Sequence, residues 1–201
     1  MNQQSIRRLT LLKTNQGLHE VNIDSVLAEQ RMINLFEPIT QDSALGFYKQ
    51  MTELLLKDDQ KPIKLLLNSP GGAIDAGKLI LDVIEGSPVP VSIYCLSQAY
   101  SMAAVIFSAA TGGRYLLPNA RLMIHQPSIN DLSGTASDIQ QMSSFLKESE
   151  RQLFEILSKN SDFTMDELEQ KAANDFYLSA DEAVRRKLAD QIITYNEMIR
   201  N

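Results

Sequence analysis

The sequence has a single cysteine, no tryptophan and only two histidines among its 201 residues. One cysteine excludes an internal disulfide framework and a cysteine-rich metal site. The histidines, His19 and His125, form neither a histidine pair nor an H-E-x-x-H motif, so we expect no metal and no other cofactor in this chain. Any chemistry that requires an imidazole must therefore use one of these two residues.

Positive charge and uninterrupted apolar runs are also scarce. The chain has 19 Lys and Arg against 25 Asp and Glu, a net charge of -6, and no basic block, which argues against a nucleic-acid surface. The charge-free segment 86–113 contains several serines and opens with Pro88 and Pro90, so a buried strand, a turn and a buried helix explain it better than a membrane span. The apolar stretch after the twin arginine at 7–8 is too short for a signal peptide, and we expect a cytoplasmic protein.

Short strands alternate with helices along the chain, which is typical of a single α/β domain. Apolar spacing and capping patterns predict strands at 31–36, 63–67, 89–96, 114–116, 122–125 and 190–194, and helices at 42–57, 73–85, 101–110 and 135–159, with shorter helices after Thr164 and Ser179. Residues 1–20 are polar and basic, and residues 1–24 are expected to form an arm, a hairpin or an axial loop that precedes a domain at 25–201. The long helix, at about 135–160, is bounded by loops and is expected to project from the core.

Two glycine-rich patterns occur where a strand turns into a helix. Residues 72–79 (GAIDAGKL) match the G-x-x-x-x-G-K of a phosphate-binding loop, but Leu79 stands where that loop needs Ser or Thr for magnesium, so the signal is weak. Residues 68–72 (NSPGG) expose backbone N–H groups at a helix start, which can hold an anion or the oxyanion of a tetrahedral intermediate. A tight turn that merely needs a positive φ is the simpler interpretation.

Ser101 is the candidate nucleophile, because it lies among small residues where a strand gives way to a helix. Such a turn lifts the hydroxyl out of the sheet and can point the N–H of the next residue, Met102, at a developing oxyanion. The G-x-S-x-G elbow is absent, and a helix N-cap serine remains the alternative. Cys95 is the rival nucleophile, but its apolar strand is more typical of a buried, inert thiol.

A serine nucleophile needs a base and a group that orients the base. His125, at the end of an apolar strand, is the available base because His19 lies in the arm. Asp175 begins an apolar stretch after a helix, so its carboxylate is a candidate for the orienting group and is expected to be partly buried. Structural roles, a hydrogen-bonded histidine and a capping aspartate, remain open for both residues.

Together these segments resemble the proteolytic subunit of the Clp protease. The family's motifs occur in order at 68–72 (NSPGG), 98–102 (QAYSM), 117–127 (LPNARLMIHQP), 137–139 (SDI) and 175–183 (DFYLSADEA). The resemblance covers about residues 30–195. It implies a fold of repeated strand–strand–helix units, shared with the crotonases, in which the long helix is a projecting handle.

The resemblance also implies an activity and an assembly. Ser101 would be the nucleophile, His125 the general base and Asp175 the orienting acid of a serine endopeptidase, and the backbone N–H groups of Gly72 and Met102 would form its oxyanion hole. The subunits would stack as two seven-membered rings around a closed chamber, giving a tetradecamer. A separate hexameric ATPase would feed in unfolded polypeptide, and ATP would be used only by that partner.

Several positions depart from the family pattern. Residues 128–131 (SIND) replace its Gly-Gly pair, Asn174 stands at its usual arginine, and Lys64 and Leu66 stand where aromatic residues line its ATPase-docking pocket. These departures predict a divergent, specialised form of the subunit.

Two other functions remain open. The chain could be a non-catalytic or partner-dependent subunit of a mixed ring with a paralogous subunit. It could also be an acyl-CoA-handling enzyme of the crotonase fold, although that function would leave the serine, histidine and aspartate without a purpose.

Overall fold

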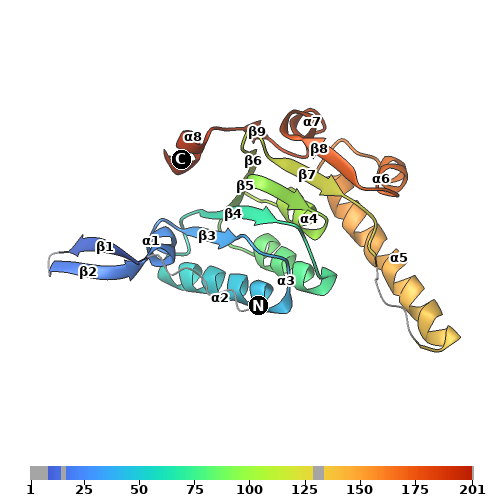
Figure 1. Ribbon diagram of the computed structural model, residues 1–201, viewed down its shortest axis with the longest axis horizontal. Helices are drawn as coiled ribbons and strands as arrows, with labels where there is room; N and C mark the ends of the chain where they lie inside the picture. Colours follow the sequence, from blue (N-terminus) through green and yellow to red (C-terminus); the bar gives the residue numbers. More distant parts are fainter. Residues whose placement is uncertain (1–8, 15–16, 129–133, 201) are drawn as a thin grey trace.

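The computed structural model describes residues 9–14, 17–128 and 134–200 (Figure 1). The strands are β1 (Leu9–Thr14), β2 (Gly17–Asn22), β3 (Met32–Leu35), β4 (Ile63–Ser69), β5 (Val91–Tyr100), β6 (Gly113–Leu116), β7 (Arg121–Ile124), β8 (Phe176–Ser179) and β9 (Gln191–Ile192). The helices are α1 (Ile23–Glu29), α2 (Gln41–Lys57), α3 (Ile74–Glu85), α4 (Met102–Ser108), α5 (Ala136–Lys159), α6 (Met165–Lys171), α7 (Ala180–Arg185) and α8 (Tyr195–Arg200). The chain is a mixed α/β domain, as predicted. The hairpin β1–β2 and the helix α5 extend from it in different directions (Figure 1).

The main sheet has seven strands and branches at β5. Strands β3, β4, β5, β6 and β9 follow one another in that order and run parallel. Residues 92–95 of β5 pair with β6, whereas residues 98–100 pair with β7, and β8 adds antiparallel to the outer edge of β7. Along one edge the carboxyl end of β5 therefore has β7 in place of β6 as its neighbour, while along the other edge Ala99 still pairs with Ser69 of β4.

Helices α2, α3, α4 and α5 contribute to the main core on one face of the sheet. Leu65 and Leu67 of β4 and Ile93 of β5 point into this core, while the alternate residues Leu66 and Tyr94 point to the opposite face. There they form a second apolar cluster, together with Met32, Tyr115, Ile193 and Met198. A sheet buried on both faces needs nearly continuous hydrophobic strands, which explains the apolar runs that the sequence shows at these positions.

The charge-free segment 86–113 forms β5, a turn and the buried helix α4, as its composition predicts. Among the described residues, no helix has the length and apolar character that crossing a membrane requires.

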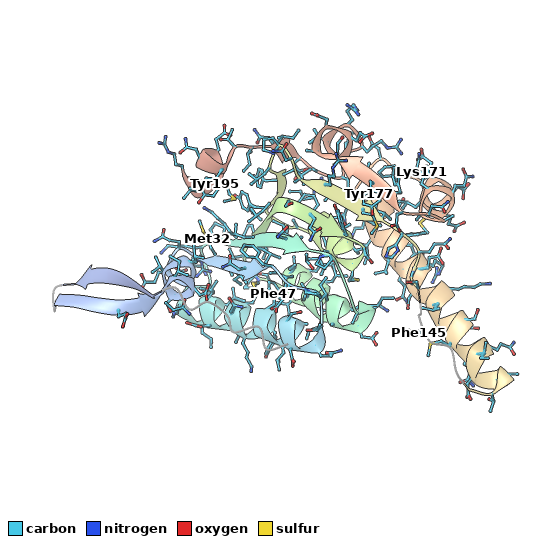
Figure 2. The ribbon with its side chains drawn as sticks, viewed as in Figure 1. Met32, Phe47, Phe145, Lys171, Tyr177 and Tyr195 are labelled. Atoms are coloured by element: carbon cyan, nitrogen blue, oxygen red, sulfur yellow. The ribbon has the colours of Figure 1, made fainter. Side chains whose placement is uncertain are left out.

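Helix α5 is anchored at one end only. Its 24 residues correspond to about 36 Å at 1.5 Å per residue. Leu153, Phe154 and Leu157 in its second half are buried in the main core, whereas Met142 and Phe145 in its first half are exposed. Figure 2 shows Phe145 on the part of the helix that leaves the body of the domain. This is the projecting helix that the sequence predicts.

Three elements were not expected from the sequence. Helices α1 and α8 flank the domain, and the four-residue strand β8 follows Asp175. The predicted arm contains the hairpin β1–β2, in which Thr14 pairs with Gly17, and its expected end at residue 24 falls in the first turn of α1. Residues 15 and 16, between the two strands of this hairpin, lie outside the described residues.

Acidic side chains take part in the N-terminal caps of several helices, and we expect them to make the free energy of unfolding depend on pH. Hydrogen bonds from the cap residue hold the pKa of four of these carboxyls below the ordinary value, those of Asp138, Glu167, Glu182 and Glu197. A lowered pKa in the folded state means that the stabilisation is complete above the ordinary pKa of about 4 and is lost as the pH falls through the lowered value.

Calorimetric melting between pH 7 and pH 3 tests this expectation. The melting temperature of the native chain should fall over the acidic part of the range. The double variant Glu167→Gln, Glu182→Gln should be less stable at pH 7 and should lose less on acidification. Equal losses in the two proteins would contradict the assignment.

Candidate active site

The sheet register brings the ends of three strands together. Tyr100 of β5 pairs with Met123 of β7, and Ile124 of β7 pairs with Phe176 of β8. The next residue in each direction is Ser101 after β5, His125 after β7 and Asp175 before β8. Because β8 is antiparallel to β7, the residue before β8 lies beside the residue after β7. The three candidate residues therefore meet at one edge of the branch.

Ser101 has an unusual backbone conformation. It separates β5 from α4 with φ 54° and ψ -124°, a region that non-glycine residues rarely adopt, and its N–H donates to the carbonyl oxygen of Met123 at 2.7 Å. Its side chain makes no capping hydrogen bond to α4. Ser101 therefore occupies the N-cap position, as the alternative interpretation had it, but its side chain does not cap the helix, because the strained turn directs the hydroxyl elsewhere.

The hydroxyl of Ser101 lies against the imidazole of His125. The distance from Oγ to Nε2 is 2.8 Å, within hydrogen-bond range. With the imidazole proton on Nδ1, Nε2 accepts the hydroxyl proton, which is the arrangement a general base requires. The histidine side chain is 28% exposed, so it is held in place and still reaches the surface.

Asp175 is near His125 but less closely held. Its Oδ1 lies 3.6 Å from Nδ1 of His125, longer than a hydrogen bond, and its side chain is 54% exposed. The sequence led us to expect a partly buried carboxylate. The exposure arises because Asp175 precedes β8, which is the outer strand of the branch. The Tyr177 hydroxyl donates to its other oxygen, Oδ2, at 3.4 Å.

The Pro-Gly-Gly turn is fixed from both sides. The Ile39 N–H donates to the Gly71 carbonyl, and the Ala73 N–H donates to the Ile39 carbonyl, both at 2.8 Å. Gly71 and Gly72 have positive φ, 88° and 151°. These contacts leave the N–H of Gly72 without a hydrogen-bond partner within the described part of the chain, and the same holds for the N–H of Met102 in the first turn of α4.

Two glycines that the sequence analysis did not assign to the site pack against the nucleophile segment. A β-carbon on Gly71 would overlap the carbonyl of Tyr100 and the β-carbon of Ser101, and it would lie 3.1 Å from the Met102 nitrogen. A β-carbon on Gly77 would overlap the side chain of Met102. In the sequence, the Gly-Gly pair at 71–72 was the feature from which the role of Gly71 could have been inferred. Gly77 lets α3 pack closely against the side chain of Met102.

A pocket of about 290 Å³ opens beside Ser101 and His125. Its walls include side chains from both α4 and the anchored half of α5: Met102, Val105, Leu153, Phe154 and Leu157. Most of the pocket surface is therefore apolar.

The rival nucleophile Cys95 lies within β5 and is fully buried. Loss of solvent around its thiol raises the pKa to about 12. Because the thiolate is the reactive form, Cys95 is inert in the folded protein.

We therefore expect iodoacetamide at pH 8 to leave Cys95 unmodified in the native protein and to modify it fully in guanidinium chloride, as read by intact mass. The Cys95→Ala variant supplies the unmodified reference in both conditions. Modification of the native chain at the rate of a free thiol would show that Cys95 is accessible after all.

The phosphate-binding pattern adds nothing to this site. The ammonium of Lys78 donates to Oε1 of Gln152 on α5 at 2.9 Å, so it ties α3 to α5. Within the described residues, no cluster of three or more His, Cys, Asp and Glu side chains has the geometry to hold a metal ion.

Some of the positions that depart from the family pattern lie within the described residues. Residues 129–131 lie outside the described residues, and Ser128 lines the pocket. Leu66 is buried in the second apolar cluster, and Lys64 is partly buried, which lowers the pKa of its ammonium group through loss of solvent.

Comparison with known proteins identifies the family. A family model described as Clp protease matches residues 15–196. ATP-dependent Clp protease proteolytic subunit 1 of Chlamydia felis is 36% identical over 182 residues, which cover 90% of this chain and 89% of that protein. ATP-dependent Clp protease proteolytic subunit 2 of Chlamydia abortus is 35% identical over 182 residues, 90% of this chain and 88% of that protein. The chain therefore belongs to the Clp protease family.

Proposed function

We propose that the protein is a serine endopeptidase subunit. Ser101 is the nucleophile, His125 the general base and Asp175 the group that orients the imidazole. The main observation in support of this proposal is the 2.8 Å contact between Ser101 Oγ and His125 Nε2 at a strained strand–helix turn. A hydroxyl that only capped a helix would need neither the strain nor the imidazole.

The arrangement of the site supports acyl transfer through a covalent intermediate. Oγ of Ser101 attacks the peptide carbonyl while Nε2 of His125 takes the hydroxyl proton. The N–H groups of Gly72 and Met102, which have no other partner among the described residues, receive the oxyanion. The imidazolium then gives its proton to the leaving amine. In the second half of the reaction, Nε2 takes a proton from a water molecule that attacks the acyl carbonyl, and it returns this proton to Oγ of Ser101 as the acyl bond breaks.

The pocket supports a preference in the substrate. Its apolar side chains from α4 and α5 suit an apolar residue next to the scissile bond, since a charged residue would lose its hydration there without gaining a partner. Unfolded polypeptides expose such residues, and folded proteins bury most of them.

The exposed half of α5 supports self-association. Ile139, Met142 and Phe145 lie three residues apart, so they share one side of the helix, and each is more than 40% exposed. A stripe of this kind is typical of a contact surface. We propose that it joins two stacked heptameric rings into a tetradecamer around a closed chamber.

Both relatives are named as ATP-dependent proteases. We propose that a separate hexameric Clp-type ATPase supplies substrate to this chamber and alone uses ATP, that no cofactor is bound by this chain, and that the assembly acts in the cytoplasm.

A second candidate is a subunit that depends on a partner for its activity. The 3.6 Å separation between His125 and Asp175 favours it, because an incompletely closed triad in a single chain leaves room for alignment by a neighbour. A paralogous proteolytic subunit in a mixed ring could supply that contact, and the absence of aromatic residues at Lys64 and Leu66 is consistent with ATPase docking through the partner.

Intact mass after incubation with a fluorophosphonate separates the two candidates. One adduct per chain on the protein alone supports a self-sufficient peptidase. An adduct that forms only after a paralogous proteolytic subunit is added supports partner dependence. No adduct in either mixture overturns both, because the reagent reacts only with an activated serine beside a formed oxyanion site.

A further inference from the structure

Asp175 has one hydrogen-bond donor among the described residues, the hydroxyl of Tyr177. That hydroxyl lies 3.4 Å from Oδ2, while the other oxygen, Oδ1, faces Nδ1 of His125 at 3.6 Å. Each oxygen of the carboxylate therefore faces a different side chain. At 54% exposure the carboxylate has little packing around it, so its orientation depends on these contacts.

Tyr177 is itself fixed by the strand that carries the nucleophile. Tyr100, Met123 and Tyr177 occupy one row across β5, β7 and β8. The rings of Tyr100 and Tyr177 meet edge to face, with centroids 5.6 Å apart and planes at 88°. This is a favourable aromatic geometry. Figure 2 labels Tyr177 on the branch of the sheet that β7 and β8 form.

We propose that Tyr177 is a positioning residue of the triad. By holding Oδ2 of Asp175 it turns Oδ1 toward the imidazole of His125, and through Tyr100 it ties the aspartate to the segment that carries Ser101. A phenol that donates to a carboxylate must keep its proton. In agreement, partial loss of solvent, followed by the negative charge of Asp175, raises the pKa of Tyr177 above its ordinary value.

The first test is Tyr177→Phe in the full chain, which removes the hydroxyl and keeps the ring. The kcat for a fluorogenic peptide should fall about tenfold, the size expected for losing a hydrogen bond to a charged group. The KM should not change, because Tyr177 is not among the residues that line the pocket. In an Asp175→Ala background the same change should have no further effect, whereas a merely structural role would lower activity in both backgrounds.

Tyr48→Phe is the matched control. Tyr48 lies on α2, is 45% exposed against 48% for Tyr177, and is not among the residues that line the pocket. Its replacement should leave kcat within twofold of the native value, roughly the scatter expected for surface substitutions. An unchanged kcat in Tyr177→Phe, or an equal loss in both variants, would overturn the proposal.

A second measurement does not require activity. With ¹⁵N-labelled histidine the imidazole signals come from only two side chains, those of His19 and His125. Tyr177→Phe should shift the Nδ1–H proton of His125 toward the position of free imidazole, and Tyr48→Phe should not. An unmoved signal would refute the role of Tyr177. The proposal rests on the peptidase function only for its kinetic readout, so a moved signal in a protein that cleaves no peptide would retain the positioning role and reject the function.

Discussion

Replacing Ser101 by alanine is expected to abolish peptide hydrolysis, with kcat falling by about six orders of magnitude, as in serine peptidases that lose the nucleophile. The covalent intermediate requires the Oγ atom, and His125 has no other hydroxyl within hydrogen-bond distance among the described residues. The kcat for a fluorogenic peptide with an apolar residue before the scissile bond measures the loss. Intact mass should show no fluorophosphonate adduct on the variant.

Ser128→Ala is the control for this experiment. Ser128 lines the same pocket, but no hydrogen bond joins it to His125. Its replacement should therefore keep the fluorophosphonate adduct, which requires the Ser101 hydroxyl, the imidazole and the oxyanion site. Circular dichroism and gel filtration of both variants should match the native protein. Hydrolysis that survives in a folded Ser101→Ala variant would exclude Ser101 as the nucleophile.

Replacing Gly72 by alanine should lower kcat by about 10²- to 10³-fold, the usual effect of losing one oxyanion donor. The new β-carbon would overlap the carbonyl oxygen of Ile39, and at φ 151° the backbone already favours glycine. The turn must therefore move, and its free N–H moves with it. Because Ile39 is hydrogen-bonded on both sides of the turn, we also expect a lower melting temperature.

Gly46→Ala is the matched control, because it makes the same chemical change in a different setting. Gly46 lies inside α2, and a β-carbon there would meet no atom within 4 Å. Alanine should leave kcat unchanged and stabilise the helix by up to about 1 kcal/mol. Native activity in Gly72→Ala would show that this turn is not the oxyanion site.

The sequence was informative where a residue's environment depends on its near neighbours. Apolar runs and capping pairs predicted most helices and strands within a few residues. The strand ends at Ser101 and His125 followed from the same patterns. The fold confirms these expectations. Ser101 and His125 are also found in contact, which follows from the pairing of Tyr100 with Met123.

The features that were missed depend on strand pairing. Strand β8 has only four residues and no clear apolar alternation, so its antiparallel register could not be predicted. That register sets the exposure of Asp175 and brings Tyr177 to Tyr100. Gly71 was interpreted as part of a tight turn. Its contact with Tyr100 and Ser101 arises only when β4 and β5 lie side by side.

The position of β8 has a consequence for how the site behaves on heating. Ser101 and His125 follow strands that are paired on both edges, whereas Asp175 precedes a strand held by four residue pairs along one edge. Short edge strands belong to the parts of a protein that open locally before the whole molecule unfolds. The aspartate can therefore leave the imidazole while the serine, the histidine and the core remain in place. On heating, the contact between Asp175 and His125 is therefore lost first. Catalytic activity should be lost at a lower temperature than the one at which the domain unfolds.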